Sequence, residues 1–185
     1  MMRFAISILL LTLLCTLPSQ RMLEIVFVGD SIVQQMHGHE SKAALHGVSG
    51  QTAQQIAQRI PRARMVILEG GTNDLFGLAA ESGIVPAYVA MLEKLHGSRV
   101  ILLGIPPIDE AQLRRTFGDN VGLLTSARIA RLNEALSILC ATYPNCRTAH
   151  AAMAMDMSGK TSDGIHFTAA GYAQLSAALA SIPIP

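Results

Sequence analysis

Short apolar runs alternate with longer amphipathic segments along the chain. The runs cover residues 23–28, 44–48, 65–69, 99–104 and 147–149, and the last is the weakest. In the segments between and after them, residues 52–60, 84–96, 125–143 and 169–181, apolar positions recur with helical spacing. The runs therefore predict strands and the longer segments predict helices.

Three of the runs, EIVFVG, MVILEGG and RVILLG, are apolar at nearly every position. Strands with one solvent-exposed face alternate between apolar and polar residues, whereas strands covered on both faces do not. Alternating strands and helices of this kind predict an α/β fold, a three-layer α/β/α sandwich around a central parallel sheet of about five strands. In such sheets, ligand sites lie in the loops that leave the carboxyl ends of the strands.

Composition narrows the domain count and the classes of partner. A chain of 185 residues, half of them hydrophobic, suits one domain with a proper core. The net charge of +1 and the absence of a basic block argue against nucleic acid and against an anionic membrane surface. Scarce aromatic residues, with no Trp, argue against a stacking platform for bases.

The N-terminal segment has the pattern of an export signal. Arg3 precedes an apolar stretch over residues 4–17, which is shorter than the roughly 20 residues that span a bilayer. We expect a signal peptide over residues 1–20, one domain over residues 21–185 without a membrane span, and a secreted or periplasmic protein. The alternative is that Met22 is the true start and the protein is cytoplasmic.

Cysteine usage agrees with export without deciding it. Removal of the leader leaves Cys140 and Cys146, an even pair six positions apart. Either they form a disulfide, as in many exported proteins, or they are two reduced, half-buried thiols.

Candidate catalytic residues follow the predicted strands. Ser31 in GDS stands where a strand meets a helix, so it is either an ordinary helix cap or a nucleophile. Asp163 and His166, in DGIH, have the spacing that lets a carboxylate orient an imidazole. Gly50 and Asn73 could donate hydrogen bonds to an oxyanion, or serve only as turn residues.

These motifs together resemble the SGNH hydrolases, also called the GDSL esterase and lipase family. The four family blocks are present in order at Gly29-Asp30-Ser31, Gly50, Gly71-Thr72-Asn73-Asp74 and Asp163-Gly164-Ile165-His166, without a departure at the motif positions. In general outline the chain is most similar to small periplasmic bacterial members with esterase, thioesterase or lysophospholipase activity. The resemblance implies a flavodoxin-like fold and hydrolysis of a small-molecule ester without a metal or organic cofactor.

The same resemblance assigns roles to the motif residues. It implies that Ser31 attacks the ester carbonyl, that His166 acts as general base and then general acid, and that Asp163 orients His166. The Ser31 N–H, the Gly50 N–H and the Asn73 side chain would stabilise the oxyanion. Acyl transfer to a sugar hydroxyl on the same site, and a non-catalytic carbohydrate- or lipid-binding role, remain the alternatives.

The neighbouring loops supply the candidate pocket walls. Leu75 and Phe76 follow the third strand and Ile105 and Ile108 follow the fourth, and their apolar side chains suit a short acyl chain. The connection over residues 105–124 is long for a compact domain, which is typical of lids and binding loops. A metal site would start from His37, His39 and Glu40, but no carboxylate or imidazole partner for them is obvious elsewhere in the sequence. We therefore expect these residues at the rim of the site.

Overall fold

The computed structural model describes residues 23–37, 43–77, 83–149 and 155–182. Within these ranges one sheet of five strands forms the centre of the molecule. The strands are β1 (Leu23–Gly29), β2 (Ala44–Gly47), β3 (Ala63–Glu69), β4 (Arg99–Gly104) and β5 (Cys146–Thr148). They pair in parallel in the order β2-β1-β3-β4-β5, which confirms the predicted parallel sheet.

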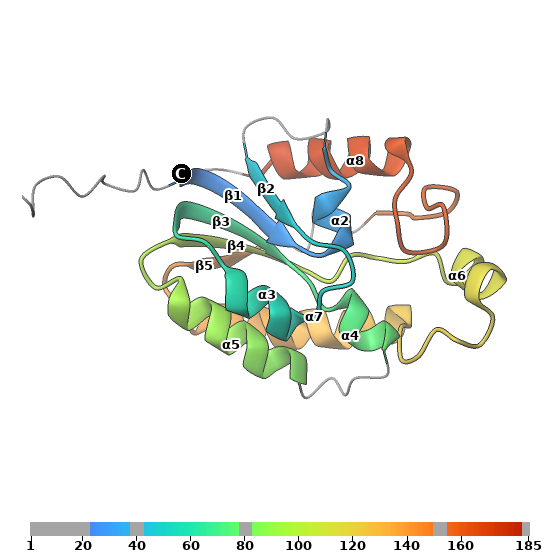
Figure 1. Cartoon of the computed structure of the whole chain (residues 1–185), viewed down its shortest axis with the longest axis horizontal. Helices are drawn as coiled ribbons and strands as arrows, with labels where there is room; N and C mark the ends of the chain where they lie inside the picture. The colour runs from blue at the N-terminus through green and yellow to red at the C-terminus, as the bar shows by residue number, and fades with distance from the viewer. Residues whose placement is uncertain (1–22, 38–42, 78–82, 150–154, 183–185) are drawn as a thin grey trace, which may run out of the picture.

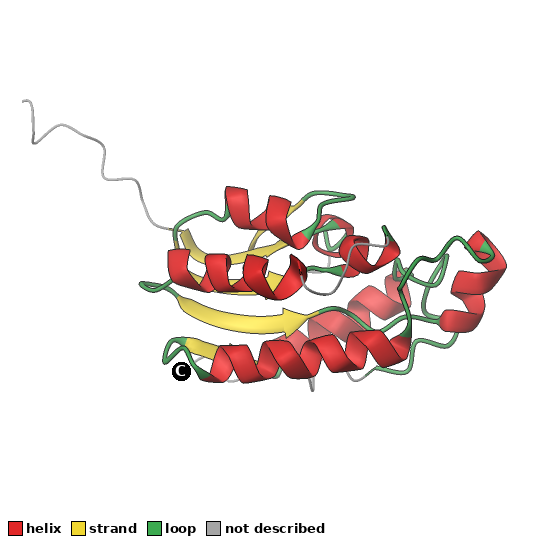
Figure 2. Cartoon of the chain, turned by 90° about the horizontal axis from the view of Figure 1, so that it is seen from below, coloured by secondary structure: helices red, strands yellow, loops and turns green. Residues whose placement is uncertain are grey.

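Helices cover both faces of this sheet. Figure 1 shows α2 and α8 on one face, and α3, α5 and α7 on the other. Figure 2, seen from below, shows the strands with helices running alongside them. The bounds of the described helices are α2 (Ser31–Gln34), α3 (Ala53–Arg59), α4 (Thr72–Phe76), α5 (Ile84–Lys94), α6 (Glu110–Phe117), α7 (Ser126–Ala141) and α8 (Ala169–Ala180).

Burial within single strands explains the three layers. Leu102 and Leu103 are successive residues of β4 and point to opposite faces, yet neither exposes any surface. Phe27 and Val28 of β1 show the same double burial. The continuous apolar runs in the sequence therefore correspond to strands packed on both faces, as predicted.

Threonine caps fix where several helices begin. Thr52 and Gln55 form a capping box at the start of α3, in which the Gln55 side chain accepts from the Thr52 backbone N–H at 2.9 Å. The Thr125 and Thr168 hydroxyls accept backbone N–H groups at the starts of α7 and α8. These caps place the helix starts within one or two residues of the predicted ones.

The strand order places a topological switch point at the carboxyl ends of β1 and β3. From β1 the chain moves outward to β2 and then returns to β3 on the other side of β1. The loops after β1 and β3 therefore diverge to opposite sides, and this switch point is where open α/β sheets bind ligands. Ser31 and Asn73 lie in α2 and α4, the short helices that follow β1 and β3.

The long connection after β4 differs from the prediction, because it contains α6. Asp109 caps this helix by accepting the Gln112 N–H at 2.9 Å, and Leu113 is its one buried residue. A helix of two turns with a single buried position has too weak a periodicity to be detected in sequence. α6 lies beyond the carboxyl ends of the strands (Figure 1).

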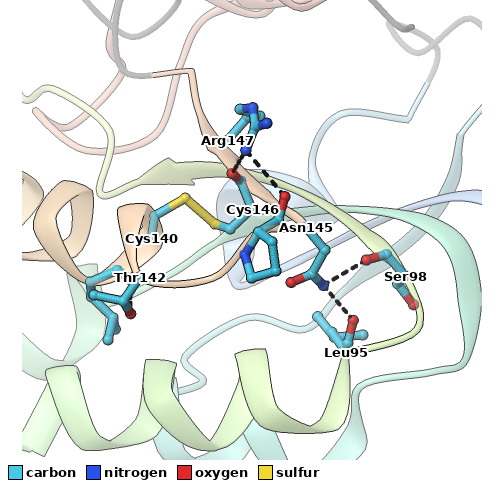
Figure 3. The surroundings of a disulfide bond; sticks show 9 residues. Leu95, Ser98, Cys140, Thr142, Asn145, Cys146 and Arg147 are labelled. Atoms are coloured by element: carbon cyan, nitrogen blue, oxygen red, sulfur yellow. Dashed lines mark hydrogen bonds between the residues drawn. A yellow bond between two sulfur atoms is a disulfide. The ribbon is translucent and has the colours of Figure 1, made fainter.

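In the structure Cys140, at the end of α7, and Cys146, at the start of β5, form a disulfide (Figure 3). Both residues are buried, with Cα atoms 5.4 Å apart. Next to it, the Asn145 side chain donates to the Leu95 and Ser98 carbonyl oxygens at 2.8 and 2.7 Å. The edge strand β5 is thus tied both to α7 and to the turn between α5 and β4.

We expect the double substitution Cys140→Ala/Cys146→Ala to lower the free energy of unfolding by about 2 to 3 kcal/mol, because the bridge restricts the unfolded chain. Urea denaturation measures this difference. Reduced wild-type protein, which keeps both sulfur atoms, controls for lost packing. An unfolding midpoint equal to that of the oxidised wild type would contradict the prediction.

None of the helices in the described ranges combines the length and the apolar character that a bilayer span requires.

Candidate active site

Ser31 is the first residue of α2, two residues after the end of β1, and its side chain is not the helix cap. The cap is Asp30, whose carboxylate accepts the Ile32 N–H at 3.0 Å. The Ser31 hydroxyl oxygen instead lies 2.9 Å from His166 Nε2. Ser31 is 5% exposed, so its hydroxyl is held by a packed turn while some surface remains open. Of the two roles considered from sequence, the structure gives the capping role to the neighbouring residue.

His166 and Asp163 extend this contact into a line of three side chains. His166 Nδ1 lies 2.6 Å from Asp163 Oδ2. The other oxygen, Oδ1, accepts the backbone N–H groups of Ile165 and His166 at 2.9 and 2.8 Å. Burial alone would raise the pKa of Asp163, but the hydrogen bonds from the His166 side chain and from these N–H groups hold it below its ordinary value. Asp163 is therefore a carboxylate at neutral pH, fixed against the imidazole.

The loop that carries Asp163 and His166 rests on α6. The Asp109 N–H, at the start of α6, donates to the Gly164 carbonyl oxygen at 3.0 Å. From the same helix, Gln112 Nε2 donates to the Ser162 carbonyl oxygen at 3.4 Å. Residues 105–124, which were expected to form a lid or binding loop, thus support the loop that carries His166.

Gly50 lies in the turn after β2. Its φ of +75° is a left-handed conformation that favours glycine, and a Cβ there would meet nothing within 4 Å among the described residues. The backbone conformation, and not crowding by the protein, therefore requires glycine here. The neighbouring Ser49 N–H donates to the side-chain oxygen of Gln34, on α2, at 2.9 Å. This bond ties the Gly50 turn to the helix that begins with Ser31.

Asn73 connects the two turns that carry Ser31 and Gly50. Its Nδ2 atom donates to Asp30 Oδ2 at 3.1 Å and to the Gln51 carbonyl oxygen at 3.0 Å. Both amide hydrogens thus have acceptors in this structure. An oxyanion at the site would share one of these hydrogens with its present acceptor.

Two further residues, to which the sequence analysis assigned no role, hold these turns together. Arg59 of α3 donates to the carbonyl oxygens of Gly29 and His46, at 2.6 and 2.7 Å, and to the Gln51 side chain. Asp74 accepts the Ala53 N–H at 2.8 Å, which fixes the start of α3 directly after the Gly50 turn. Asp74 was visible as part of the GGTND motif, whereas nothing in the sequence marked Arg59.

The four predicted pocket residues are more buried than a pocket wall requires. Leu75 and Ile105 have no exposed surface, so in this structure they are core side chains and not walls of an open pocket. Ile108 is 9% exposed, and Phe76 is half-buried with its ring edge-to-face against Phe117. Leu75 and Phe76 end the short helix α4 and Ile105 directly follows β4, and the sequence pattern did not reveal that these segments pack into the core.

The candidate metal residues contribute no described cluster. His37 is exposed, while His39 and Glu40 lie outside the described residues. Across the described ranges, no three His, Cys, Asp or Glu side chains gather closely enough to hold a metal ion.

Sequence comparison assigns the chain to a family. The model of the GDSL-like lipase/acylhydrolase family matches residues 27–174, a range that includes Ser31, Gly50, Asn73, Asp163 and His166. The chain therefore belongs to the GDSL-like lipase/acylhydrolase family, as its four motifs indicated. This assignment supports a hydrolase. No curated protein matches the chain.

Several solved structures share the fold. A Streptococcus pneumonia protein proposed to be a platelet activating factor has a TM-score of 0.73 at 21% identity, with 96% of this chain and 97% of its own covered. A lipase/acylhydrolase from Enterococcus faecalis has a TM-score of 0.67 at 19% identity, with 85% and 93% covered. The C-terminal catalytic domain of Streptococcus pneumoniae peptidoglycan O-acetyltransferase A has a TM-score of 0.59 at 15% identity, with 86% and 92% covered. At these identities the likeness shows the three-layer fold alone.

Proposed function

We propose that the protein is a serine hydrolase that cleaves small carboxylic esters of short to medium acyl chain, with Ser31 as nucleophile. One observation carries the proposal: Ser31 Oγ, His166 and Asp163 lie in a hydrogen-bonded line, with contacts of 2.9 and 2.6 Å. This is the arrangement in which a base removes the hydroxyl proton and a carboxylate fixes the base.

The reaction follows from these contacts. Ser31 Oγ attacks the ester carbonyl carbon as its proton passes to His166 Nε2, and the Asp163 carboxylate stabilises the imidazolium. The tetrahedral intermediate then expels the alcohol, which takes the proton from His166, and leaves an acyl group on Ser31. Water attacks this acyl-enzyme in the same way, with His166 as base, and the acid is released.

The negative charge that develops on the carbonyl oxygen in the transition state needs hydrogen-bond donors at the carboxyl ends of β1 and β3. We assign this role to the backbone N–H groups of Ser31 and Gly50 and to the side chain of Asn73. The hydrogen bonds of Asn73 to Asp30 and Gln51 support the assignment, because they hold the amide between the two turns that carry the other donors.

We expect Asn73→Ala to lower kcat about a hundred- to a thousandfold, with a smaller change in KM, because an oxyanion donor acts mainly in the transition state. Steady-state hydrolysis of a p-nitrophenyl ester measures both constants. Asn145→Ala is the matched control, since Asn145 Nδ2 also donates to two oxygen atoms, the carbonyl oxygens of Leu95 and Ser98, but at the disulfide edge of the sheet. Near-normal turnover in Asn73→Ala, or an equal loss in Asn145→Ala, would contradict the assignment.

A series of p-nitrophenyl esters from acetate to palmitate tests the substrate class. We expect hydrolysis to be fastest for short or medium acyl chains. Preference for the longest chains would contradict the chain-length proposal, and no hydrolysis by folded protein would contradict ester cleavage of this kind. Acyl-sugar, lysophospholipid and thioester substrates, assayed beside this series, identify the leaving group.

Acyl transfer is the second candidate, because the peptidoglycan O-acetyltransferase A domain shares the fold. The same acyl-Ser31 would then react with a sugar hydroxyl in place of water. Product analysis with and without an alcohol acceptor separates the two outcomes: ester formed at the expense of free acid indicates transfer.

We also propose that the protein is secreted or periplasmic. The disulfide between Cys140 and Cys146 supports this location, since such bonds persist in oxidising compartments. N-terminal sequencing of the protein from a periplasmic fraction tests it. Recovery only from the cytoplasm, with Met22 as the first residue, would contradict it.

A further inference from the structure

A pair of fully buried carboxyl groups lies directly behind the Ser31 turn. Asp30 precedes Ser31, Glu69 ends the neighbouring strand β3, and both side chains have no exposed surface. The Asp30 N–H donates to Glu69 Oε2 at 3.1 Å. A Cβ at Gly29 would stand 2.2 Å from the same oxygen, so glycine at position 29 leaves the space that the Glu69 carboxyl occupies. The proposed mechanism uses neither acid.

Hydrogen bonding around the pair indicates which acid is ionised. Both oxygens of Asp30 accept hydrogen bonds, Oδ1 from the Ile32 N–H and Oδ2 from Asn73 Nδ2. Glu69 Oε1, in contrast, is buried and has no partner among the described residues. A charged oxygen without a donor is costly in a buried site, whereas a protonated carboxyl avoids that cost. The surroundings therefore favour a carboxylate on Asp30 and a proton on Glu69.

The electrostatic surroundings agree with this distribution. Burial and the charge of Asp30 raise the pKa of Glu69 well above its ordinary value. Burial raises the pKa of Asp30 to about 6, although the Ile32 N–H, the Glu69 carboxyl and the charge of His166 oppose the rise. Two buried carboxyl groups in contact cannot both ionise without large repulsion. The other titratable groups that act on the pair from the elements around it are Arg59 of α3, Asp74 of α4, Tyr88 of α5, Tyr172 of α8 and His166.

We propose that Glu69 is a positioning residue that stays protonated and shares its proton with Asp30, so that the Asp30 carboxylate holds the Asn73 amide and the Ser31 turn in place. The catalytic part of this inference rests on the proposed function, since it assumes that Asn73 faces an oxyanion. A second negative charge behind the Ser31 turn would oppose the charge that develops there in the transition state. A neutral Glu69 avoids this repulsion and still fixes Asp30.

The protonation state is tested without any assay of activity. Wild-type protein at neutral pH should show an infrared carbonyl band of a protonated carboxylic acid, and Glu69→Gln should lose it. Glu24→Gln, at an exposed carboxylate on β1, is the matched control and should leave the band unchanged. A spectrum of Glu69→Gln that keeps the band, or a wild type without one, would overturn the inference.

Linkage to stability gives an independent check on the proton. An unfolded Glu69 loses its proton above about pH 4, while the folded protein retains it. The folded state then binds more protons, so wild-type stability falls as pH rises toward the pKa of folded Glu69. Glu69→Gln removes this contribution. In urea denaturation between about pH 5 and pH 8, the free energy of unfolding of the variant should therefore rise relative to that of the wild type as pH rises. An equal pH dependence in both proteins would contradict a retained proton.

Turnover then tests positioning. Glu69→Gln keeps an acceptor for the Asp30 N–H and a neutral donor for its carboxylate, so we expect kcat within a fewfold of wild type. Glu69→Leu keeps the volume but lacks the donor, and we expect kcat to fall about ten- to a hundredfold with a smaller change in KM, the range for a lost hydrogen bond to a charged group.

Each remaining outcome decides part of the inference. Unchanged kcat in folded Glu69→Leu would overturn positioning even if the infrared band is present. Should Glu69→Leu not fold, Asp30→Asn replaces it: its amide would face the Asn73 amide donor to donor, so kcat should fall at least as far, and unchanged kcat would overturn the inference. If Ser31→Ala kept wild-type activity, the proposed function would fail while the infrared and stability results still stood.

Discussion

Replacing Ser31 by alanine is expected to lower kcat about a million-fold, since the acyl-enzyme cannot form without the hydroxyl oxygen. The substitution removes one atom from a residue in the first turn of α2, where Asp30 and not Ser31 caps the helix. The fold should therefore be preserved. Steady-state hydrolysis of a p-nitrophenyl ester by both proteins measures the loss, and an organophosphate probe that adds its mass to the Ser31 peptide in the wild type alone locates the nucleophile.

Ser49→Ala is the matched control for this substitution. Ser49 is exposed in the adjacent Gly50 turn, and its described contact to Gln34 is made by the backbone N–H, which alanine retains. We expect turnover close to wild type in this control. Residual activity in Ser31→Ala of more than about a thousandth of wild type would mean that another group forms the covalent bond or that none is needed.

The sequence predicted the sheet well because each long strand is buried on both faces. That burial demands nearly unbroken apolar runs, which half-exposed strands do not have. The first, third and fourth strands were found almost at their observed ends. The fifth begins one residue earlier than predicted, at Cys146, since a three-residue edge strand has little pattern of its own.

Short helices were the part of the fold that pattern analysis could not find. α2, α4 and α6 have between four and eight residues, fewer than the three turns over which a helical period becomes clear. Asp30 and Asp109 cap α2 and α6, and such caps depend on single residues and not on a repeating pattern. Leu75, near the end of α4, and Ile105, directly after β4, were expected in the pocket and are core residues.

For the candidate site, the sequence predicted side chains that the structure brings together, but not the residues that hold them in place. Strand-end loops of a parallel sheet meet at one edge, which is why Ser31, Asn73 and His166 could be grouped from sequence. Glu69 looked like the last residue of an apolar run, and its burial against Asp30 depends on strand pairing between β1 and β3. Contacts of this type follow from tertiary packing and have no signature in spacing.

Asp163→Asn is expected to lower kcat about ten-thousandfold with little change in the fold. The asparagine oxygen can still accept the Ile165 and His166 N–H groups that Oδ1 accepts now, so the loop keeps its shape. The amide nitrogen would then take the place of Oδ2, 2.6 Å from His166 Nδ1, and would donate to it. Nδ1 must become an acceptor, which moves the ring proton to Nε2, the atom that faces Ser31. In that tautomer His166 cannot take the hydroxyl proton.

Measurement of kcat across the pH range distinguishes this explanation from a general loss of structure. With the wrong tautomer, His166 cannot act as the base, and the remaining turnover depends on hydroxide ion. The residual kcat of Asp163→Asn should therefore rise with pH in the range where the wild-type kcat is constant. Asp156→Asn is the matched control, because the Asp156 carboxylate also accepts a nearby backbone N–H, that of Ser158 at 3.0 Å. Asp156 is exposed and has no hydrogen bond to an imidazole among the described residues. It should leave kcat unchanged. A wild-type rate and pH profile in Asp163→Asn would remove Asp163 from the mechanism and leave His166 to act without a partner.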